Sequence, residues 1–259
     1  MQRLIYQVNI GKPSKLYNFC IKSVREYCNK YKIDHFEQTR AILNVKPDLK
    51  TTGRSKECVS REVPLPIFEK ENAFNDLRFY NQVAIIDADI YIKPNAPNIF
   101  DQIDYGIDFA GVVERDMPII PKYKNKIIGY SRGQYSTLKD VDWKWNHSGG
   151  HFMNMGVMVM NQSILQYIDE DPPAYFIYRP EFKKFVDGVG KWKWSTDQTL
   201  LNYWLKKENI KVQELNWKWN SLYNAIYPES IKKAYFVHFF LKDHLPNKGE
   251  NIKDLLSLI

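Results

Sequence analysis

The chain has 259 residues, a mass of 30.7 kDa and a formal net charge of +7. Its composition is that of an ordinary globular protein, and its length suits one large α/β domain or two small ones. No apolar run approaches the ~20 residues that a membrane-spanning helix needs. No secretory signal is recognisable in residues 1–10, so we expect a cytoplasmic protein with at most peripheral membrane contact.

The cysteines limit the covalent and metal sites that we expect, and the charge limits the kinds of binding partner. Cys20, Cys28 and Cys58 are odd in number and lack CxxC spacing, so we expect neither a disulfide framework nor a zinc site. The isoelectric point of about 9.0 suits an anionic partner. Three classes fit: nucleic acid, a phospholipid surface and a phosphorylated small molecule. Because the lysines are scattered and form no basic arm, we do not expect nucleic acid.

The first part of the chain predicts the start of an α/β unit. We expect, in chain order, a strand at 3–10, a helix at 14–32, a short strand at 35–40, an irregular segment at 46–66 and a helix at 66–82. A strand that leads into a helix and back to a strand is typical of sheets flanked by helices.

The remainder continues this alternation. We expect strands at 83–86, 107–114, 152–161, 211–215 and 234–240, and helices from 162 to about Asp169, at 178–188 and at 196–208, the last capped by Ser195 or Thr196. Pro172 and Pro173 are expected to end the first of these helices before the next one begins. Residues 115–150 predict a long loop, a length that is more often functional than idle. No linker marks a boundary, so we expect a single domain over 1–259, with a nucleotide-binding half (1–114) and an acceptor and sugar-binding half (115–259).

The tripeptide WKW occurs three times, at 143–145, 192–194 and 217–219. In an extended segment both rings of such a tripeptide would lie on one side. Each tryptophan by itself is best explained as an anchor in the core or at its rim. Three copies in polar surroundings also suggest a surface that stacks on sugars or bases. We therefore expect these tripeptides and the 115–150 segment to form the acceptor surface.

The strand VAII (83–86) ends in Asp87-Ala88-Asp89. Alternate residues of an extended chain point to the same side, so the two carboxylates converge. Like charges held this close are costly unless a cation neutralises them or one is protonated. Oxygen ligands favour Mn²⁺ or Mg²⁺, which proteins often share with substrate phosphates. The pair therefore predicts a metal site at the end of a buried strand, where open α/β sheets bind ligands.

Four further segments follow in order: FMNMGVMVMN (152–161), STDQTLLN (195–202), LNWKWN (215–220) and VHFFLKDHLP (237–246). With the aspartate pair they resemble the GT-A fold glycosyltransferases, most closely the retaining family-eight enzymes that include glycogenin and bacterial lipopolysaccharide galactosyl- and glucosyltransferases. The resemblance covers most of the chain. It implies an α/β GT-A fold with a Rossmann-like mixed central sheet, and transfer of a hexose, glucose or galactose, from a UDP-sugar to a glycan, lipid or protein acceptor.

The resemblance also implies roles for particular residues. Asp87, Asp89 and His238 would hold the metal, with Ala88 between the two aspartates at the donor diphosphate. The other donor contacts would be Lys70, Asn154, Gly156 and Asp197, and Gln198 would lie near the anomeric centre. Uridine is expected near Tyr6. Catalytic roles therefore fall on Asp197, Gln198 and Asn154.

The last segment departs from the family pattern. Where the family has a phosphate-contacting lysine, six residues after the histidine, this chain has His244; Lys242 is a candidate replacement. The family's further sugar-contacting acid has no clean equivalent, and Glu114 and Asp116 are candidates for it.

Other interpretations stay open at this level. Each motif by itself has a structural explanation. Asn154 could be a buried asparagine that satisfies a bulged strand, and Asp197 could complement the dipole in the first turn of its helix. Lys70 could be a solvated lysine, and His238 a core histidine. The alternative functions are an inverting GT-A transferase with a carboxylate base, a nucleotidyltransferase, and a non-catalytic module that binds sugar or nucleic acid on the same scaffold.

Overall fold

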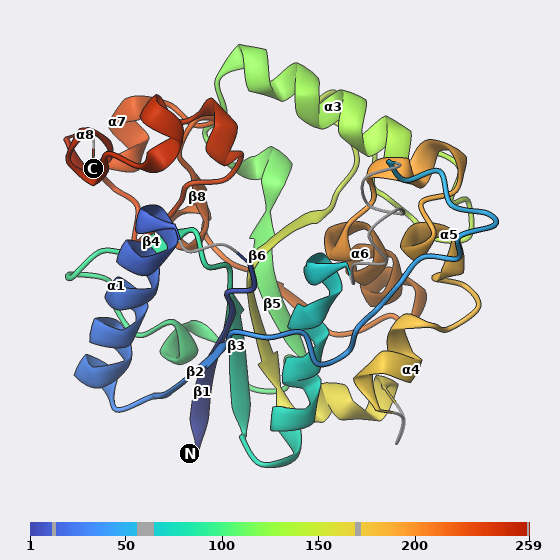
Figure 1. Cartoon of the computed structure of the whole chain (residues 1–259), viewed down its shortest axis with the longest axis horizontal. Helices are drawn as coiled ribbons and strands as arrows, with labels where there is room; N and C mark the ends of the chain where they lie inside the picture. Colours follow the sequence, from blue (N-terminus) through green and yellow to red (C-terminus); the bar gives the residue numbers. More distant parts are fainter. Residues whose placement is uncertain (12–13, 56–64, 169–171, 258) are drawn as a thin grey trace.

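The computed structural model describes residues 1–11, 14–55, 65–168, 172–257 and 259. Two mixed sheets and their flanking helices form one α/β domain (Figure 1). Cys58, Asp169 and part of the expected irregular segment at 46–66 lie outside the described residues.

A six-stranded sheet forms the centre of the molecule. In spatial order its strands are β2 (Asp34–Gln38), β1 (Arg3–Val8), β3 (Gln82–Ile86), β6 (Met153–Asn161), β5 (Phe109–Val113) and β7 (Val212–Glu214). The β1 strand pairs in parallel with β2 and β3, whereas β6 runs antiparallel to both β3 and β5. The carboxyl ends of β1 and β3 therefore meet the amino end of β6 at one edge of the sheet, where all three can supply side chains to one site.

A second, three-stranded sheet lies beside this edge. Its order is β4 (Ile90–Ile92), β9 (Phe236–His238) and β8 (Ser221–Leu222). The β4 strand begins one residue after Asp89, and its register places Ile90 opposite His238. The small sheet thus brings a histidine from the last part of the chain next to the aspartate pair.

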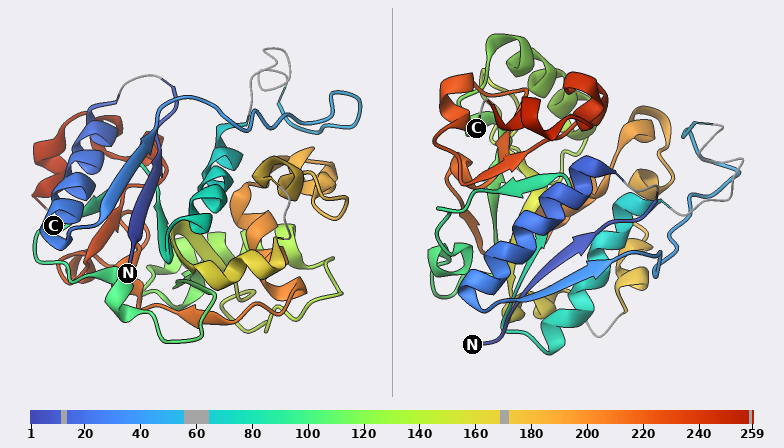
Figure 2. Two further views of the ribbon diagram at one scale, coloured as in Figure 1. Left: turned by 90° about the horizontal axis from the view of Figure 1, so that it is seen from below. Right: turned by 60° about the vertical axis from the view of Figure 1, so that its left-hand side comes forward.

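Helices cover both faces of the large sheet (Figures 1 and 2). On one side lies α1 (Lys15–Tyr31), with the small sheet and the C-terminal helices. On the other lies the 3₁₀ helix η1 (Pro66–Arg78), with α4 (Pro173–Ile177), α5 (Lys183–Val186) and α6 (Asp197–Lys207). The remaining helical segments are η2 (Ile99–Gln102), η3 (Glu114–Asp116), α3 (Pro121–Tyr135), η4 (Gln162–Tyr167), η5 (Gly190–Trp194), η6 (Trp217–Trp219), α7 (Pro228–Ile231), η7 (Lys242–His244), η8 (Pro246–Gly249) and α8 (Ile252–Leu256).

The central strands are buried on both faces, as their apolar sequences require. All five residues of β3 are buried, and alternate side chains enter different cores. Val83 and Ile85 pack under η1 and α6, whereas Ala84 and Ile86 pack under α1 and the small sheet. Because both faces are filled, the strands form a rigid base for the polar residues that follow them.

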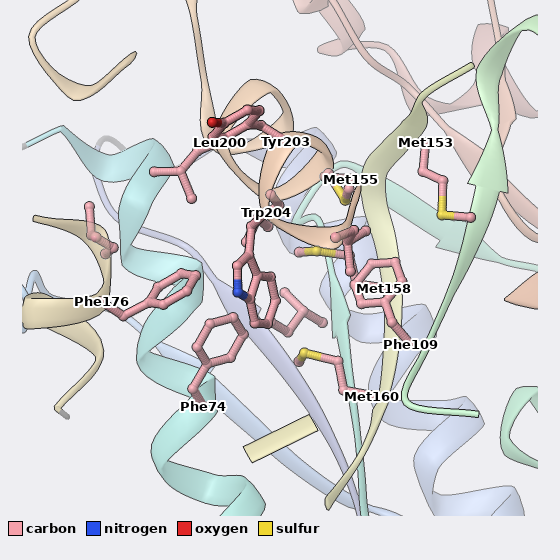
Figure 3. Close-up of a cluster of buried hydrophobic side chains, with 14 of the residues drawn as sticks. Phe74, Phe109, Met153, Met155, Met158, Met160, Phe176, Leu200, Tyr203 and Trp204 are labelled. Atoms are coloured by element: carbon pink, nitrogen blue, oxygen red, sulfur yellow. The ribbon is translucent and has the colours of Figure 1, made fainter. Parts of the chain in front are cut away.

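Aromatic and methionine side chains fill the core on the α6 side (Figure 3). Trp204 lies at its centre, 4.9 Å from Phe176 and 6.0 Å from Phe74 between ring centroids. Phe176 meets both Trp204 and Phe74 edge to face, whereas Trp204 and Phe74 are tilted; these ring contacts fix the relative positions of η1, α4 and α6. The cluster therefore holds in place the two helices that carry Lys70 and Asp197.

The structure corrects two predictions. The 115–150 segment is not a loop throughout, because α3 occupies Pro121–Tyr135. Its buried face includes the polar Ser131 and Gln134, and it contains two glycines, so the helical pattern is weak in the sequence. The predicted break at Pro172 and Pro173 separates η4, which ends at Tyr167, from α4, which begins at Pro173, where the missing N–H costs nothing. The predicted helix at 178–188 is reduced to α5.

The WKW tripeptides also differ from the expected extended form. The copies at 192–194 and 217–219 are 3₁₀ helices. Trp143 and Trp219 are buried, and Trp143 stacks on Tyr135, whereas Trp145 and Trp194 are exposed. The three copies therefore lie in three different connections and differ in the exposure of their rings. Among the described helices none has the length and hydropathy needed to cross a bilayer.

Candidate active site

The aspartate pair and His238 meet at the edge of the large sheet. The Nε2 atom of His238 lies 3.2 Å from Asp89 Oδ1 and 3.8 Å from Asp87 Oδ2. One ligand atom of each of the three residues lies within 4.8 Å of the others. Two carboxylates and an imidazole are a donor set that suits Mn²⁺ or Mg²⁺, so these residues fit a divalent cation.

Backbone pairing sets the positions of the two carboxylates. The N–H of Asp87 donates to the carbonyl of Gly156 on β6, and the carbonyl of Asp89 accepts from the N–H of Phe239, just after β9. The pair is therefore anchored to the large sheet at one end and to the small sheet at the other.

A chain of side-chain hydrogen bonds orients His238. Its Nδ1 lies 3.0 Å from Asn220 Oδ1, and Asn220 Nδ2 donates to Asn154 Oδ1 at 2.9 Å. Because the amide oxygen of Asn220 only accepts, Nδ1 carries the hydrogen. Nε2 then faces the two aspartates. Burial by itself would lower the pKa of His238, but the Asp89 carboxylate raises it by more, so the net pKa is above the ordinary value.

Asn154 lies where the ladder between β5 and β6 is interrupted, because the pairing shifts between Gly111 and Val112. Its Oδ1 accepts from Gly156 N–H and from Asn220, and its Nδ2 donates to Glu114 Oε2 at 3.0 Å. One of the two amide hydrogens of Asn154 has no partner in these bonds. The side chain is thus fixed with one donor left for a ligand.

Glu114 is itself buried, and its burial raises its pKa, although the bonds from Asn154 and Tyr123 act in the opposite direction. Glu114 therefore holds the side chain of Asn154 in place through the hydrogen bond that it accepts from Nδ2. Asp116, the other candidate for the sugar-contacting acid, is exposed and lies near His151 and Glu214.

Lys70 connects the aspartate pair to α6. Its Nζ lies 2.8 Å from Asp87 Oδ1 and 2.7 Å from Asp197 Oδ2, and it donates to the carbonyl of Met155. Burial by itself would lower the pKa of Lys70, but the two carboxylates raise it above the ordinary value. The ammonium group is therefore retained inside the site.

The start of α6 places Asp197 and Gln198. Thr196 is the N-cap, and its side-chain oxygen accepts from Gln198 N–H, as the sequence predicts. Gln198 Oε1 accepts from Met155 N–H at 3.3 Å. The α6 helix and β6 are thereby joined at the site.

These groups line one cavity of about 380 Å³. Predicted residues from well-separated segments of the sequence meet here: Lys70, Asp87, Ala88, Asp89, Asn154, Gly156, Asp197, Gln198 and His238. A volume of this size, with convergent polar groups, suits a small-molecule site.

Two predicted residues lie elsewhere. Tyr6 is fully buried in the core, where its hydroxyl donates to Gln38 and accepts from Asn72. Its ring is enclosed by the core and is not among the described residues that line the cavity, so Tyr6 is not placed to stack on a base. Lys242 binds Ser14 Oγ and Glu250 and lies over the ring of Tyr17. It is not among the lining residues.

Sequence reasoning missed two residues. Tyr17, on the first turns of α1, lines the cavity next to Val8, Asn9 and Ile10. Asn220 orients His238, and its presence in LNWKWN (215–220) was the available signal. No such signal marked Tyr17, because an aromatic near the start of a helix is common.

Comparison with solved structures agrees on the architecture. A glycosyltransferase involved in the glycosylation of the major capsid of PBCV-1 superposes with a TM-score of 0.52 at 14% identity, covering 99% of this chain and 100% of that one. The galactosyltransferase LgtC, in complex with donor and acceptor sugar analogues, gives 0.54 at 13% identity, with coverages of 98% and 94%. Mouse xyloside xylosyltransferase 1 gives 0.50 at 12%, with coverages of 95% and 100%.

The chain has the GT-A fold. At these identities the likeness establishes the fold alone, and the predicted fold class is confirmed. No family model and no curated protein matches the sequence.

Proposed function

We propose that the protein is a metal-dependent glycosyltransferase that transfers a hexose from a UDP-sugar to an acceptor hydroxyl. The observation that carries the proposal is the meeting of Asp87, Asp89 and His238 at a cavity that also holds Lys70 and Asp197. A binding site for a diphosphate sugar needs cations for the phosphates and hydrogen-bonding groups for the sugar, and this cavity offers both.

Asp87, Asp89 and His238 would hold Mn²⁺ or Mg²⁺. When bound, such an ion stabilises the negative charge that develops on a departing diphosphate. Lys70 holds Asp87 and Asp197 in fixed positions and adds positive charge to the same cavity. Asn154 offers its remaining amide hydrogen to a sugar hydroxyl, while Asp197 and Gln198 orient the ring so that the anomeric carbon faces the acceptor.

We further propose retention of anomeric configuration. An inverting enzyme needs a carboxylate base. Among the described residues that line the cavity, the carboxylates are Asp87, Asp89 and Asp197, and each lies within ion-pair distance of Lys70 or His238. This arrangement favours front-face attack, in which the bond from the anomeric carbon to phosphate breaks, the bond to the acceptor oxygen forms, and the acceptor proton passes to the phosphate oxygen.

The donor is proposed in finer detail. Tyr17, with Val8, Asn9 and Ile10, would contact the base in place of Tyr6, so residues 1–114 supply most nucleotide contacts and residues 115–259 most sugar contacts. Glucose and galactose are the proposed sugars, and the likeness to LgtC, which is a galactosyltransferase, makes galactose the first to test. The cytoplasmic location stays a prediction.

The test is release of UDP from a panel of UDP-sugars with Mn²⁺, with and without chelator. We expect chelator-sensitive release that favours one sugar and falls about a hundredfold in Asp89→Asn. The matched control is Asp116→Asn, the same change at an exposed carboxylate outside the cavity, which should retain activity. Proton NMR of the product would report the anomeric configuration. Absence of both release and metal-dependent UDP binding would overturn the proposal.

A further inference from the structure

A second cavity, of about 250 Å³, lies between the first turns of α3 and the segment around η7. Lys122 and Lys126, one turn apart on α3, line one side of it, and His244 lines the other. The aromatic rings of Tyr123 and Phe240 also line it, with centroids 5.5 Å apart. It combines basic groups with aromatic surface.

This cavity has an excess of positive charge. None of the described residues that line it is acidic. With the residues that the structure describes, neither Lys122 nor Lys126 forms an ion pair or a side-chain hydrogen bond, and both are exposed. The α3 sequence, PKYKNKIIGYSRGQY, contains four basic residues and no acidic one. Asp243, next to His244 in the chain, is not a lining residue; its Oδ1 lies 3.6 Å from Nζ of Lys248.

Side-chain contacts connect this cavity to the donor cavity. Tyr123 lines the second cavity and donates its hydroxyl hydrogen to Glu114, which accepts from Asn154 in the donor cavity. Phe240 lines the second cavity and contacts the imidazole of His238, with ring centroids 5.8 Å apart. A molecule that spans both cavities would therefore lie beside the proposed sugar site and the proposed metal site.

We propose that this second cavity binds an anionic group, a phosphate or a carboxylate, of the acceptor. The inference rests on the proposed function and adds the chemical class of its acceptor: a glycan that carries a negative charge close to the accepting hydroxyl. Ammonium groups donate strong hydrogen bonds to such anions. The rings of Tyr123 and Phe240 offer apolar surface to a sugar ring. A neutral acceptor would gain less from the two lysines, because their hydrogen bonds to uncharged hydroxyls are weaker.

The test uses isotope-labelled protein saturated with UDP and Mg²⁺, so that the donor cavity is filled, titrated by NMR with glucose, glucose 6-phosphate and glucuronate. We expect the charged probes to bind more tightly than glucose. The double variant Lys122→Gln/Lys126→Gln should weaken them about fivefold and leave UDP binding unchanged. The matched control is Lys124→Gln/Arg132→Gln, which removes two charges from the same helix outside the cavity and should have little effect.

The possible outcomes separate the two proposals. Preference for both charged probes, or for one of them, supports the inference and in the second case identifies the anion. Equal binding of all three probes would overturn it, as would an equal loss in the control variant. Failure of the wild type to bind UDP would instead overturn the proposed function, because that measurement involves neither lysine.

Discussion

His238 packs directly against Gly156. A Cβ atom added to Gly156 would lie 2.5 Å from His238 Cε1 and 2.6 Å from Nδ1, closer than real Cβ contacts occur. The two residues belong to different sheets, so this contact sets how closely the small sheet approaches β6. Glycine is required at position 156 because the imidazole of His238 leaves no room for a Cβ atom, and not because of its backbone conformation.

We therefore expect Gly156→Ala to displace His238 and to weaken Mn²⁺-dependent UDP binding about tenfold or more. The matched control is Gly129→Ala on α3, where an added Cβ meets nothing within 4 Å. Alanine favours a helix by about 0.5–1 kcal/mol over glycine, so the control should bind UDP normally with an unchanged or slightly higher Tm. Calorimetric titration and thermal unfolding measure both effects. Normal metal dependence in Gly156→Ala would contradict the assignment of His238.

Asn220 provides a second test of the same histidine. Its Oδ1 fixes the Nδ1 hydrogen of His238, and its Nδ2 holds Asn154. We expect Asn220→Ala to lower Mn²⁺ affinity about tenfold. Asn220→Asp, which keeps the acceptor for Nδ1 but loses the donors to Asn154, should retain more of the metal affinity and lose transfer activity. The same loss of metal affinity in both variants would show that the acceptor oxygen is not what matters.

Much of the fold could be predicted from the sequence, and so could most of the polar residues that line the cavity of the candidate site. The apolar run before Asp87 and the N-cap before Asp197 are local signals, and the structure contains the strand and the helix where the sequence predicts them. The joint placement of the other site residues rested on the order of their motifs along the chain.

Three features could not be predicted. Tyr6 was misplaced because strand alternation does not show how deep in the core a side chain lies: Val8, on the same face of β1, lines the cavity, whereas Tyr6 is fully buried. The α3 helix was missed because its inner face carries Ser131 and Gln134. The β4 and β8 strands are short, and only pairing with β9 makes them strands, so no local pattern identifies them.

Lys70 offers a test of buried charge. Removing it as Lys70→Met leaves Asp87 and Asp197 near each other without their shared cation. Loss of one partner from a buried ion pair costs about 3–5 kcal/mol. Since Asp87 is 27% exposed in its side chain, we expect the lower end of that range, measured by urea unfolding. The double variant Lys70→Met/Asp197→Asn should recover part of the free energy of unfolding. A double variant less stable than Lys70→Met would indicate that Asp197 has partners other than Lys70.

The pH dependence of stability can be tested away from the site, at Asp140. Hydrogen bonds from Lys207 and Tyr203 lower the pKa of Asp140 from 3.8 to about 2. A carboxyl whose pKa is lower in the folded state stabilises the fold above its unfolded pKa and loses this contribution as the pH falls through the folded value. Because the Asp140 side chain is 42% exposed, solvent screens the interaction, and its contribution at neutral pH should be about 1 kcal/mol or less.

We therefore expect Asp140→Asn to lower the free energy of unfolding at neutral pH by up to that amount, with the difference from wild type shrinking between about pH 4 and pH 2. Urea unfolding at a series of pH values measures this difference in the free energy of unfolding. Added salt should reduce the difference at neutral pH, because the ion pair between Asp140 and Lys207 is exposed. The control is Asp142→Asn, a nearby aspartate that forms no ion pair with the described residues and accepts from Lys144 N–H. A difference for Asp140→Asn that stayed constant down to pH 2 would mean that the lost hydrogen bonds, and not the charge, account for it.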